Sequence, residues 1–187
     1  MQPPTPVFTL DRCGWIAQAI VQPSPNGDSR PVGMPIELLV IHNISLPPGG
    51  FGGGCVADLF LNRLDCDAHP YFDRLRGLRV SSHFLIGRSG VLTQFVSCLD
   101  RAWHAGVSRW RGRERCNDFS IGIELEGTDD TPFRDEQYDC LVALTRTLRS
   151  AYPIADIQGH SDIAPGRKTD PGPCFDWSRY RIALVAE

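Results

Sequence analysis

A run of six residues, Ile36-Glu37-Leu38-Leu39-Val40-Ile41, narrows the possible folds of this chain more than any other stretch, because five of the six are apolar. A strand with one solvated face alternates apolar and polar residues, whereas a continuous apolar run is typical of a strand buried on both faces. The run leads directly to His42 and Asn43. It therefore predicts a central strand of an α/β sheet with polar side chains at its carboxyl end, where such sheets carry their sites.

The remaining patterns predict strands with helices between them, one β-hairpin included. We therefore expect an α/β fold, a single domain with a mixed central β-sheet flanked by helices. Residues 1–35, rich in proline, glycine and polar residues, are expected to wrap the surface of this domain, whose main body spans residues 36–187. The other expected elements are a helix over 55–64, a polar loop over 65–79, a hairpin of 83–88 and 91–96, an irregular stretch over 101–116, a strand over 119–125, a helix from Thr131-Pro132 to Pro153, a strand over 154–157 and a last helix from Asp176 to Val185.

The composition excludes several classes of protein. The net charge of −3 argues against a general nucleic-acid binder, which carries a strongly basic surface. The first residues lack the basic and apolar segments of a signal peptide, and no window approaches the ~18 to 20 apolar residues of a membrane span. The seven cysteines are odd in number and include no Cys-x-x-Cys pair, so we expect reduced, mostly buried thiols. These features indicate a cytoplasmic protein without a membrane or nucleic-acid partner.

The stretch 159–173 contains three chemically active side chains, His160, Lys168 and Asp170. Its three prolines and three glycines argue against a helix or a long strand. Loops held by a rigid scaffold are frequent carriers of function. We therefore expect this stretch to present chemistry rather than only to connect elements.

Two histidines and an aspartate form a candidate metal site. His42 and His160 each follow a predicted strand, and Asp170 comes ten residues after His160. A His₂Asp set suits Zn²⁺ and leaves a fourth position open for water, as in catalytic rather than structural zinc sites. The alternative for each histidine is a hydrogen-bonded side chain at the rim of the sheet.

Carboxylates on one strand supply a candidate base. Glu124 and Glu126 alternate with Ile123 and Leu125, so both carboxylates point to the face opposite the apolar pair. Gly122 and its counterpart at 127 suggest close approach of the backbone to another group. The alternative is an exposed polar face without a catalytic role.

The basic residues allow two interpretations. Lys168 is either a solvated loop lysine or, two residues from Asp170, a cation that meets negative charge on a substrate. Arg79 and the arginines between 101 and 115 are either surface charges or a pocket for substrate carboxylates, which arginine binds through two parallel hydrogen bonds.

Several longer motifs occur between residues 36 and 178. They are His-Asn-Ile-Ser-Leu-Pro-Pro-Gly-Gly-Phe-Gly-Gly at 42–53, Ala-His-Pro-Tyr-Phe at 68–72, Arg-Val-Ser-Ser-His at 79–83, Ala-Trp-His-Ala-Gly-Val at 102–107, the segment 112–128, and the stretch 159–173 with Phe-Asp-Trp at 175–177. These motifs closely resemble one enzyme family, the AmpD-type 1,6-anhydro-N-acetylmuramoyl-L-alanine amidases of Gram-negative bacteria. This family is part of the zinc amidase superfamily that includes phage T7 lysozyme and peptidoglycan recognition proteins. The resemblance runs from about residue 36 to 178, and the N-terminal 30 residues match only loosely.

The resemblance implies a zinc amidase fold over 36–187 and a reaction. The enzyme would use Zn²⁺ to hydrolyse the amide bond between 1,6-anhydro-N-acetylmuramic acid and L-alanine of a stem peptide, as a monomer that acts on small anhydro-muropeptides in cytoplasmic peptidoglycan recycling. By position, the resemblance implies zinc ligands His42, His160 and Asp170, the catalytic carboxylate Glu124 with its cationic partner Lys168, and substrate contacts by Asn43, Arg79, Arg115 and Ala164. It leaves His69, His83 and His104 in supporting or structural roles, and Asp162 and Glu126 outside the ligand set.

Two other classes compete with this interpretation. A muropeptide-binding sensor would have lost a zinc ligand, whereas this sequence keeps all three ligands and the Glu124–Lys168 pair. An exported amidase that attacks polymeric peptidoglycan would carry a signal peptide, which the sequence lacks. Both differences favour the cytoplasmic enzyme.

Overall fold

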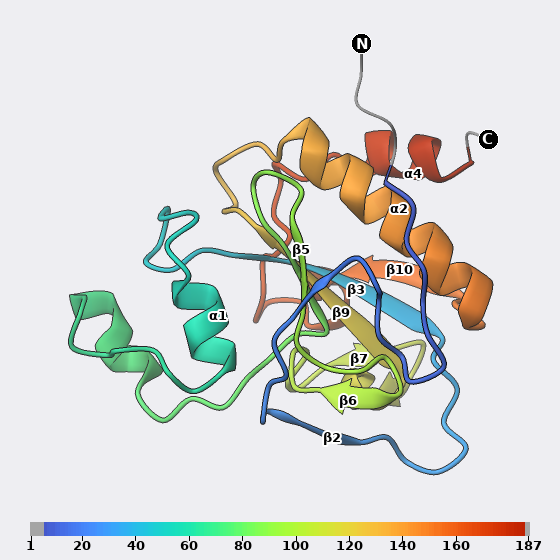
Figure 1. Ribbon diagram of the computed structural model, residues 1–187, viewed down its shortest axis with the longest axis horizontal. Coiled ribbons are helices and arrows are strands. Elements are labelled where there is room, and N and C mark those ends of the chain that lie inside the picture. Colours follow the sequence, from blue (N-terminus) through green and yellow to red (C-terminus); the bar gives the residue numbers. More distant parts are fainter. Residues whose placement is uncertain (1–5, 186–187) are drawn as a thin grey trace.

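The computed structural model describes residues 6–185 and centres on a six-stranded sheet of order β1-β5-β4-β9-β3-β10 (Figure 1). The four neighbouring strands β4, β9, β3 and β10 run parallel, while β5 pairs with β4 in the antiparallel direction. This confirms the expected single α/β domain with a mixed sheet. The strands are β1 (Ile20–Val21), β2 (Gly27–Ser29), β3 (Leu38–Ile44), β4 (Phe84–Ile86), β5 (Leu92–Gln94), β6 (Asp100–Ala102), β7 (Arg109–Trp110), β8 (Arg113–Glu114), β9 (Ser120–Glu126) and β10 (Asp156–Gly159).

Helices cover the sheet, and α2 and α4 lie side by side on one of its faces (Figure 1). Asp176 caps α4 as expected, because its carboxylate accepts a hydrogen bond from the N–H of Arg179 at 2.9 Å. Within residues 6–185, none of the helices has the length and apolar character needed to cross a membrane. The helices are α1 (Cys55–Phe60), α2 (Asp135–Ala151), α3 (His160–Ile163) and α4 (Trp177–Val185), with 3₁₀ helices η1 (Pro70–Leu75) and η2 (Cys116–Asp118).

The central strands are buried on both faces, as the apolar run predicts. Leu39 and Ile41 of β3 pack with Leu141 of α2 in the larger core. Leu38 and Val40 point to the opposite face and pack in a second, smaller core. Polar side chains therefore have room only in the carboxyl-terminal part of β3, after the apolar residues 38–41.

The structure corrects the expected bounds of four elements. β3 continues to Ile44, so His42 lies within the strand rather than after it. α2 begins at Asp135 rather than at Thr131, because Thr131 pairs with Thr128 in an isolated β-bridge. The strand expected at 154–157 is shifted to Asp156–Gly159, and the helix expected over 55–64 ends at Phe60.

Short elements occur in segments that were expected to be loops. The stretch 159–173 contains the one-turn helix α3, the loop 65–79 contains η1, and the stretch 101–116 contains β7 and β8. These elements are two to six residues long. Such lengths span too few periods for apolar patterning to reveal them.

The N-terminal segment does more than cover the surface. Ile16 is fully buried in the larger core, and β1 forms the edge of the main sheet. The expectation of a surface wrap is therefore wrong for Ile16, whereas both residues of β1 are exposed at the sheet edge; residues 1–5 lie outside the described residues. The division of the chain between residues 35 and 36 stays a prediction.

Arg30 ties this N-terminal segment to the base of β9. Its guanidinium donates hydrogen bonds to the backbone carbonyls of Asn117 at 3.0 Å, Asp118 at 3.1 Å and Ser120 at 2.8 Å, and also to that of Cys98. Burial lowers the pKa of Arg30 to about 10. The side chain therefore satisfies carbonyls that water reaches poorly.

Replacing Arg30 with methionine is expected to lower the free energy of unfolding by about 3 kcal/mol, because a buried acceptor left without a donor costs ~1 to 3 kcal/mol. Urea unfolding measures the change. Arg12→Met, at an exposed position of the same segment, serves as the control and should change stability by less than ~0.5 kcal/mol. Equal effects of the two substitutions would contradict a structural role for the Arg30 contacts.

His83 directly precedes β4, and its imidazole is fully buried. Its Nδ1 accepts the N–H of Gly122 at 3.0 Å, and its Nε2 donates to the carbonyl of Asp100 at 3.1 Å. Burial, followed by the charge of Arg30, lowers the pKa of His83 well below its usual value. The folded protein therefore holds this ring neutral.

A neutral buried histidine makes stability depend on pH. The unfolded chain takes up this proton below about pH 6.5 while the folded chain does not, so the stabilisation is complete above that pH and falls by ~1.4 kcal/mol for each pH unit below it. We expect His83→Asn to make the free energy of unfolding fall less steeply between pH 6 and pH 5 than it does in the wild type. Urea titrations of both proteins at the two pH values test this expectation. An equal dependence of the unfolding free energy on pH in variant and wild type would show that His83 is protonated in the folded state.

Candidate active site

Three parallel strands bring the predicted site residues to one place. The register of β3 and β9 sets His42 opposite Glu124. β10 pairs with the other side of β3, with Gly159 opposite Ile41, so that His160 at the start of α3 follows beside His42. Residues distant in sequence therefore meet because their strands are neighbours.

The chain after α3 folds back against this helix. The N–H of Ser161 donates to the carbonyl of Asp170 at 2.9 Å. A Cβ atom at Gly159 would lie 2.8 Å from the ring of Pro171, so a side chain there would obstruct the approach. The fold-back carries the Asp170 carboxylate to His160.

Three potential ligand atoms converge at this point. The Nδ1 atoms of His42 and His160 lie 3.0 Å apart, and Oδ2 of Asp170 lies 2.9 Å from the first and 3.0 Å from the second. Tetrahedral zinc with bonds of ~2.0 to 2.1 Å places its ligand atoms ~3.3 Å apart, so a small adjustment admits the ion. The Nε2 atom of His160 lies 3.0 Å from the carbonyl of Ala105, and donation there frees Nδ1 for a metal. The donor set fits zinc and leaves a fourth position open.

The protonation states suit a cation. Burial lowers the pKa of His42 to about 4, against the opposing effect of the Asp170 carboxylate 2.9 Å away. Burial works to raise the pKa of Asp170, but its close contacts with the rings of His160 and His42 outweigh it and hold the pKa below its usual range. A neutral imidazole and an ionised carboxylate are the forms that bind metal.

Glu124 is the buried carboxylate beside the three ligands. Its Oε1 lies 3.9 Å from Nδ1 of His42, and its Oε2 is buried without a hydrogen-bond partner among residues 6–185. Burial, and then the charge of Asp170, raises the pKa of Glu124 well above its usual value, while the charge of Lys168 opposes the rise. A buried, unpaired carboxylate of raised pKa is suited to exchange a proton with a bound molecule.

Lys168 is the only lysine in the 187-residue sequence. It lines the same cavity as Glu124, and its positive charge acts on both Glu124 and His42. Its backbone N–H donates to the carbonyl of Ala164 at 3.1 Å, which holds the loop close to α3. The lysine is therefore placed to meet negative charge beside the ligands.

Two hollows adjoin the site. The ligand hollow, of about 570 Å³, is lined by the three ligands together with Glu124, Lys168 and Asn43. The arginine hollow, of about 540 Å³, is lined by Arg115 and Ala164, with further arginines at 109 and 167. The structure therefore places Asn43 in one cavity and both Arg115 and Ala164 in the other.

The predicted substrate residues differ in their exposure and partners. The side-chain amide of Asn43 donates to Asp129 at 2.7 Å and to the carbonyl of Pro171 at 3.0 Å, which leaves its oxygen as the group that can meet a ligand. Arg115 is largely exposed and pairs with Asp118 at 3.2 Å. Arg79 is exposed at the rim, next to residues that line the ligand hollow, rather than in its wall.

Arg167 lines both hollows, although the sequence patterns did not predict a role for it. Its guanidinium donates to the carbonyls of Ala105 at 2.8 Å and Val107 at 2.6 Å. It therefore forms part of the wall between the hollows. Its position directly before Lys168 in the stretch 159–173 was the available signal.

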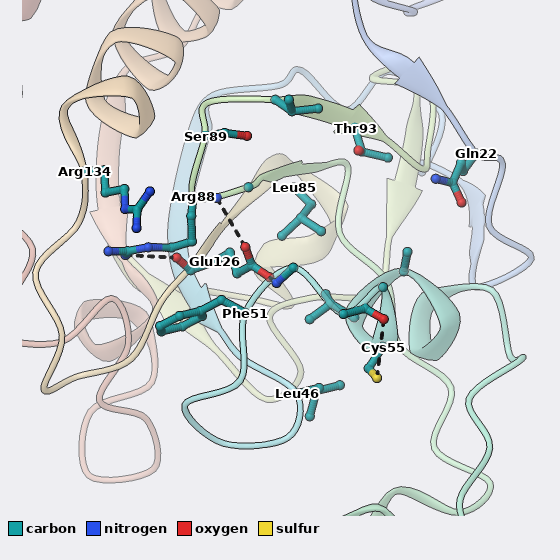
Figure 2. Close-up of a pocket in the computed structure, with 17 residues that line it drawn as sticks. Gln22, Leu46, Phe51, Cys55, Leu85, Arg88, Ser89, Thr93, Glu126 and Arg134 are labelled. Carbon is teal, nitrogen blue, oxygen red and sulfur yellow. Dashed lines mark hydrogen bonds between the residues drawn. The ribbon is translucent and has the colours of Figure 1, made fainter. Parts of the chain in front are cut away.

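Glu126, the companion carboxylate on β9, lines a third hollow of about 520 Å³ (Figure 2). Its two oxygens accept the backbone N–H groups of Gly52 and Arg88. Gly52 has φ of 75°, a conformation that glycine adopts without strain. Glu126 thus holds the glycine-rich loop against the β4–β5 hairpin, and its contacts agree with its exclusion from the ligand set.

The family model for N-acetylmuramoyl-L-alanine amidase matches residues 32–173 of this chain. That range contains the three candidate ligands, Glu124 and Lys168. The chain belongs to the N-acetylmuramoyl-L-alanine amidase family and is an enzyme of that class.

Within this family the chain is similar to one particular group, 1,6-anhydro-N-acetylmuramyl-L-alanine amidases called AmpD. It is 59% identical to AmpD of Enterobacter cloacae over 174 residues, which cover 92% of this chain and 93% of the relative. It is 54% identical to AmpD of Escherichia coli K12 over 176 residues, covering 93% and 96%. The resemblance to AmpD-type amidases is confirmed.

Solved structures agree with this assignment. A crystal structure of an AmpD derivative superimposes with a TM-score of 0.92 at 55% identity, covering 95% of this chain and 99% of the other. AmiD of E. coli, in a complex with the substrate anhydro-N-acetylmuramic acid-L-Ala-D-γ-Glu-L-Lys, gives a TM-score of 0.60 at 31% identity, covering 83% of this chain and 60% of AmiD. A human PGRP shares the fold, with a TM-score of 0.54 at 18% identity, covering 88% and 90%.

Proposed function

We propose that this enzyme is a zinc-dependent amidase that hydrolyses the bond between 1,6-anhydro-N-acetylmuramic acid and L-alanine of a stem peptide in cytoplasmic peptidoglycan recycling. The observation that carries the proposal is the convergence of the His42, His160 and Asp170 ligand atoms beside the unpaired carboxylate of Glu124. Similarity to AmpD enzymes over 92% of this chain supports the substrate.

The side chains divide the chemistry among them. His42, His160 and Asp170 would hold a zinc ion, which when bound would supply a Lewis acid to polarise the amide carbonyl and make water more acidic. Glu124 takes a proton from the attacking water and returns it to the departing amine of alanine, a double role that its raised pKa suits. Lys168 stabilises the negative charge that develops on the carbonyl oxygen.

The two hollows accommodate the two parts of the substrate. The sugar and the scissile amide lie in the ligand hollow, where the side-chain oxygen of Asn43 is available to accept a hydrogen bond. The stem peptide extends to the arginine hollow, where Arg115 binds its carboxylates and Ala164 forms part of the wall. Arg79 approaches the peptide from the rim.

The setting of the reaction follows from the same features. All seven cysteines are free thiols, with Cys98, Cys116 and Cys140 buried, which suits a reducing compartment. The net charge of −3 gives no basis for binding nucleic acid. We propose a cytoplasmic monomer that acts on small muropeptides without a membrane partner.

The substrate is tested by comparing three materials at equal concentration of scissile bonds. These are anhydro-N-acetylmuramyl-tripeptide, the same peptide on ordinary N-acetylmuramic acid, and purified sacculi. Mass spectrometry of released L-alanine-terminated peptide is expected to show that the anhydro-muropeptide is cleaved at least ~10-fold faster than the others, equivalent to ~1.4 kcal/mol of discrimination. Efficient release from sacculi with poor use of the anhydro-muropeptide would overturn the substrate assignment.

A further inference from the structure

A chain of hydrogen bonds leads from His42 away from the ligand atoms. Nε2 of His42 lies 2.9 Å from Nδ1 of His104. Nε2 of His104 lies 3.2 Å from the hydroxyl oxygen of Ser120, and that hydroxyl lies 2.6 Å from the carbonyl of Cys116. Three consecutive contacts therefore connect the ring of a candidate ligand to a backbone acceptor.

The carbonyl of Cys116, at the end of this series of hydrogen bonds, determines on which atoms the hydrogens lie. A carbonyl has no hydrogen to give, so the hydroxyl of Ser120 donates its single hydrogen to Cys116 and must accept from Nε2 of His104. A neutral imidazole has one ring hydrogen, so Nδ1 of His104 is an acceptor. His42 consequently donates from Nε2, and its Nδ1 is left with a free lone pair that faces His160 and Asp170.

Packing holds His104 in this position. The ring lies directly on Gly122 of β9, where a Cβ atom would come within 2.5 Å of the ring carbon Cγ and 2.6 Å of Nδ1. The backbone N–H of His104 donates to the side-chain oxygen of Asn117 at 3.2 Å. Ser120 is fully buried two residues before Gly122 on the same strand. The glycine is therefore needed because His104 occupies the space of a side chain.

We propose that His104 and Ser120 are positioning residues that fix the tautomer of His42 and direct its Nδ1 lone pair to the metal. This inference rests on the zinc site of the proposed function. His160 needs no such relay, because its Nε2 lies within hydrogen-bonding distance of the carbonyl of Ala105. Carbonyls of this kind are obligate acceptors, whereas a histidine partner is an acceptor only while its own hydrogen is held elsewhere. The hydroxyl of Ser120 holds the hydrogen of His104 at Nε2 and so leaves Nδ1 as an acceptor.

The test compares two buried serines of the same region. Ser120→Ala removes the end of the relay, whereas Ser82→Ala removes an equally buried hydroxyl that donates to the carbonyl of Gly122 at 2.7 Å and lies outside the relay. The zinc dissociation constant is measured by competition with a chromogenic chelator. We expect Ser120→Ala to raise it by ~10-fold, since losing such an outer contact typically weakens a metal site by ~10- to 100-fold. Ser82→Ala should leave it within ~2-fold.

A second pair of variants addresses His104 itself. His104→Asn retains an oxygen acceptor near the position of Nδ1 and should bind zinc more tightly than His104→Leu, which has none. Nitrogen-15 spectra of the metal-free wild type should show the ring hydrogen of both His42 and His104 on Nε2. These spectra report the tautomers without reference to turnover. If His104 had a purely structural role, the spectra of Ser120→Ala and Ser82→Ala would show the same tautomers.

The outcomes separate the relay from the proposed function. Tight zinc binding by the wild type with equal affinities in Ser120→Ala and Ser82→Ala would overturn the relay and leave the amidase proposal standing. A ring hydrogen on Nδ1 of His42 in the metal-free protein would also overturn it. Failure of the wild type to bind zinc at all would overturn both.

Discussion

Replacing Glu124 with glutamine is expected to lower kcat for muropeptide hydrolysis by about 10³-fold, while the protein retains about one zinc ion per chain. General acid–base groups contribute ~10² to 10⁴ in rate, and glutamine keeps the shape of the side chain without its basicity. Zinc should remain because the three candidate ligand atoms belong to other residues. Loss of turnover without loss of metal is the result specific to a proton-transferring residue.

The measurement combines steady-state hydrolysis of anhydro-N-acetylmuramyl-tripeptide with metal analysis of the purified variant. Glu126→Gln is the matched control, since Glu126 lies two residues further along β9 and binds the glycine-rich loop instead (Figure 2). Its kcat should fall much less than that of the Glu124 variant. Near-normal turnover in Glu124→Gln would exclude Glu124 as the base.

Replacing Lys168 with methionine is expected to lower kcat by ~10²- to 10³-fold, the usual effect of removing one group that stabilises an oxyanion. Methionine fills a similar volume without charge. Lys168→Arg keeps the charge in a wider and more rigid group, so we expect it to recover part of the loss. A similar defect in both variants would contradict a mainly electrostatic role. An unchanged kcat in Lys168→Met would exclude any catalytic role of Lys168.

The presence of a single lysine allows a direct observation of this side chain. Reductive methylation with carbon-13 reagent labels Lys168 and otherwise only the amino terminus. Because Lys168 lines the ligand hollow, its signal should shift when zinc is added. A shift confined to the amino-terminal signal would place Lys168 away from the metal.

The sequence predicted the parts of the fold that depend on long patterns. The apolar run at 36–41 identifies the buried strand β3, and alternation at 119–125 identifies β9, because each pattern extends over several residues. His42 and Glu124 each lie near the carboxyl end of one of these strands, and the structure shows the register that sets them opposite each other. The site could therefore be inferred before its geometry was known, although the catalytic roles stay predictions.

The features that the sequence did not predict depend on contacts between distant segments. Arg30 reaches carbonyls about ninety positions away, at 117–120, and no periodicity in the N-terminal segment signals such a role. The function of Gly122 becomes clear only when His104 is seen to lie on it. The direction of the relay through Ser120 likewise depends on the carbonyl of Cys116, a backbone group that residue types do not reveal. Long-range polar contacts leave little trace in local pattern.

The measurement that tests the zinc amidase mechanism most directly is hydrolysis of anhydro-N-acetylmuramyl-tripeptide, followed by mass spectrometry, before and after treatment with a strong chelator. We expect chelation to abolish release of the L-alanine-terminated peptide and added zinc to restore it, because His42, His160 and Asp170 form the only cluster of three potential ligand residues of this kind found among residues 6–185. Cleavage that continues unchanged in the chelated protein would contradict the mechanism at its metal centre.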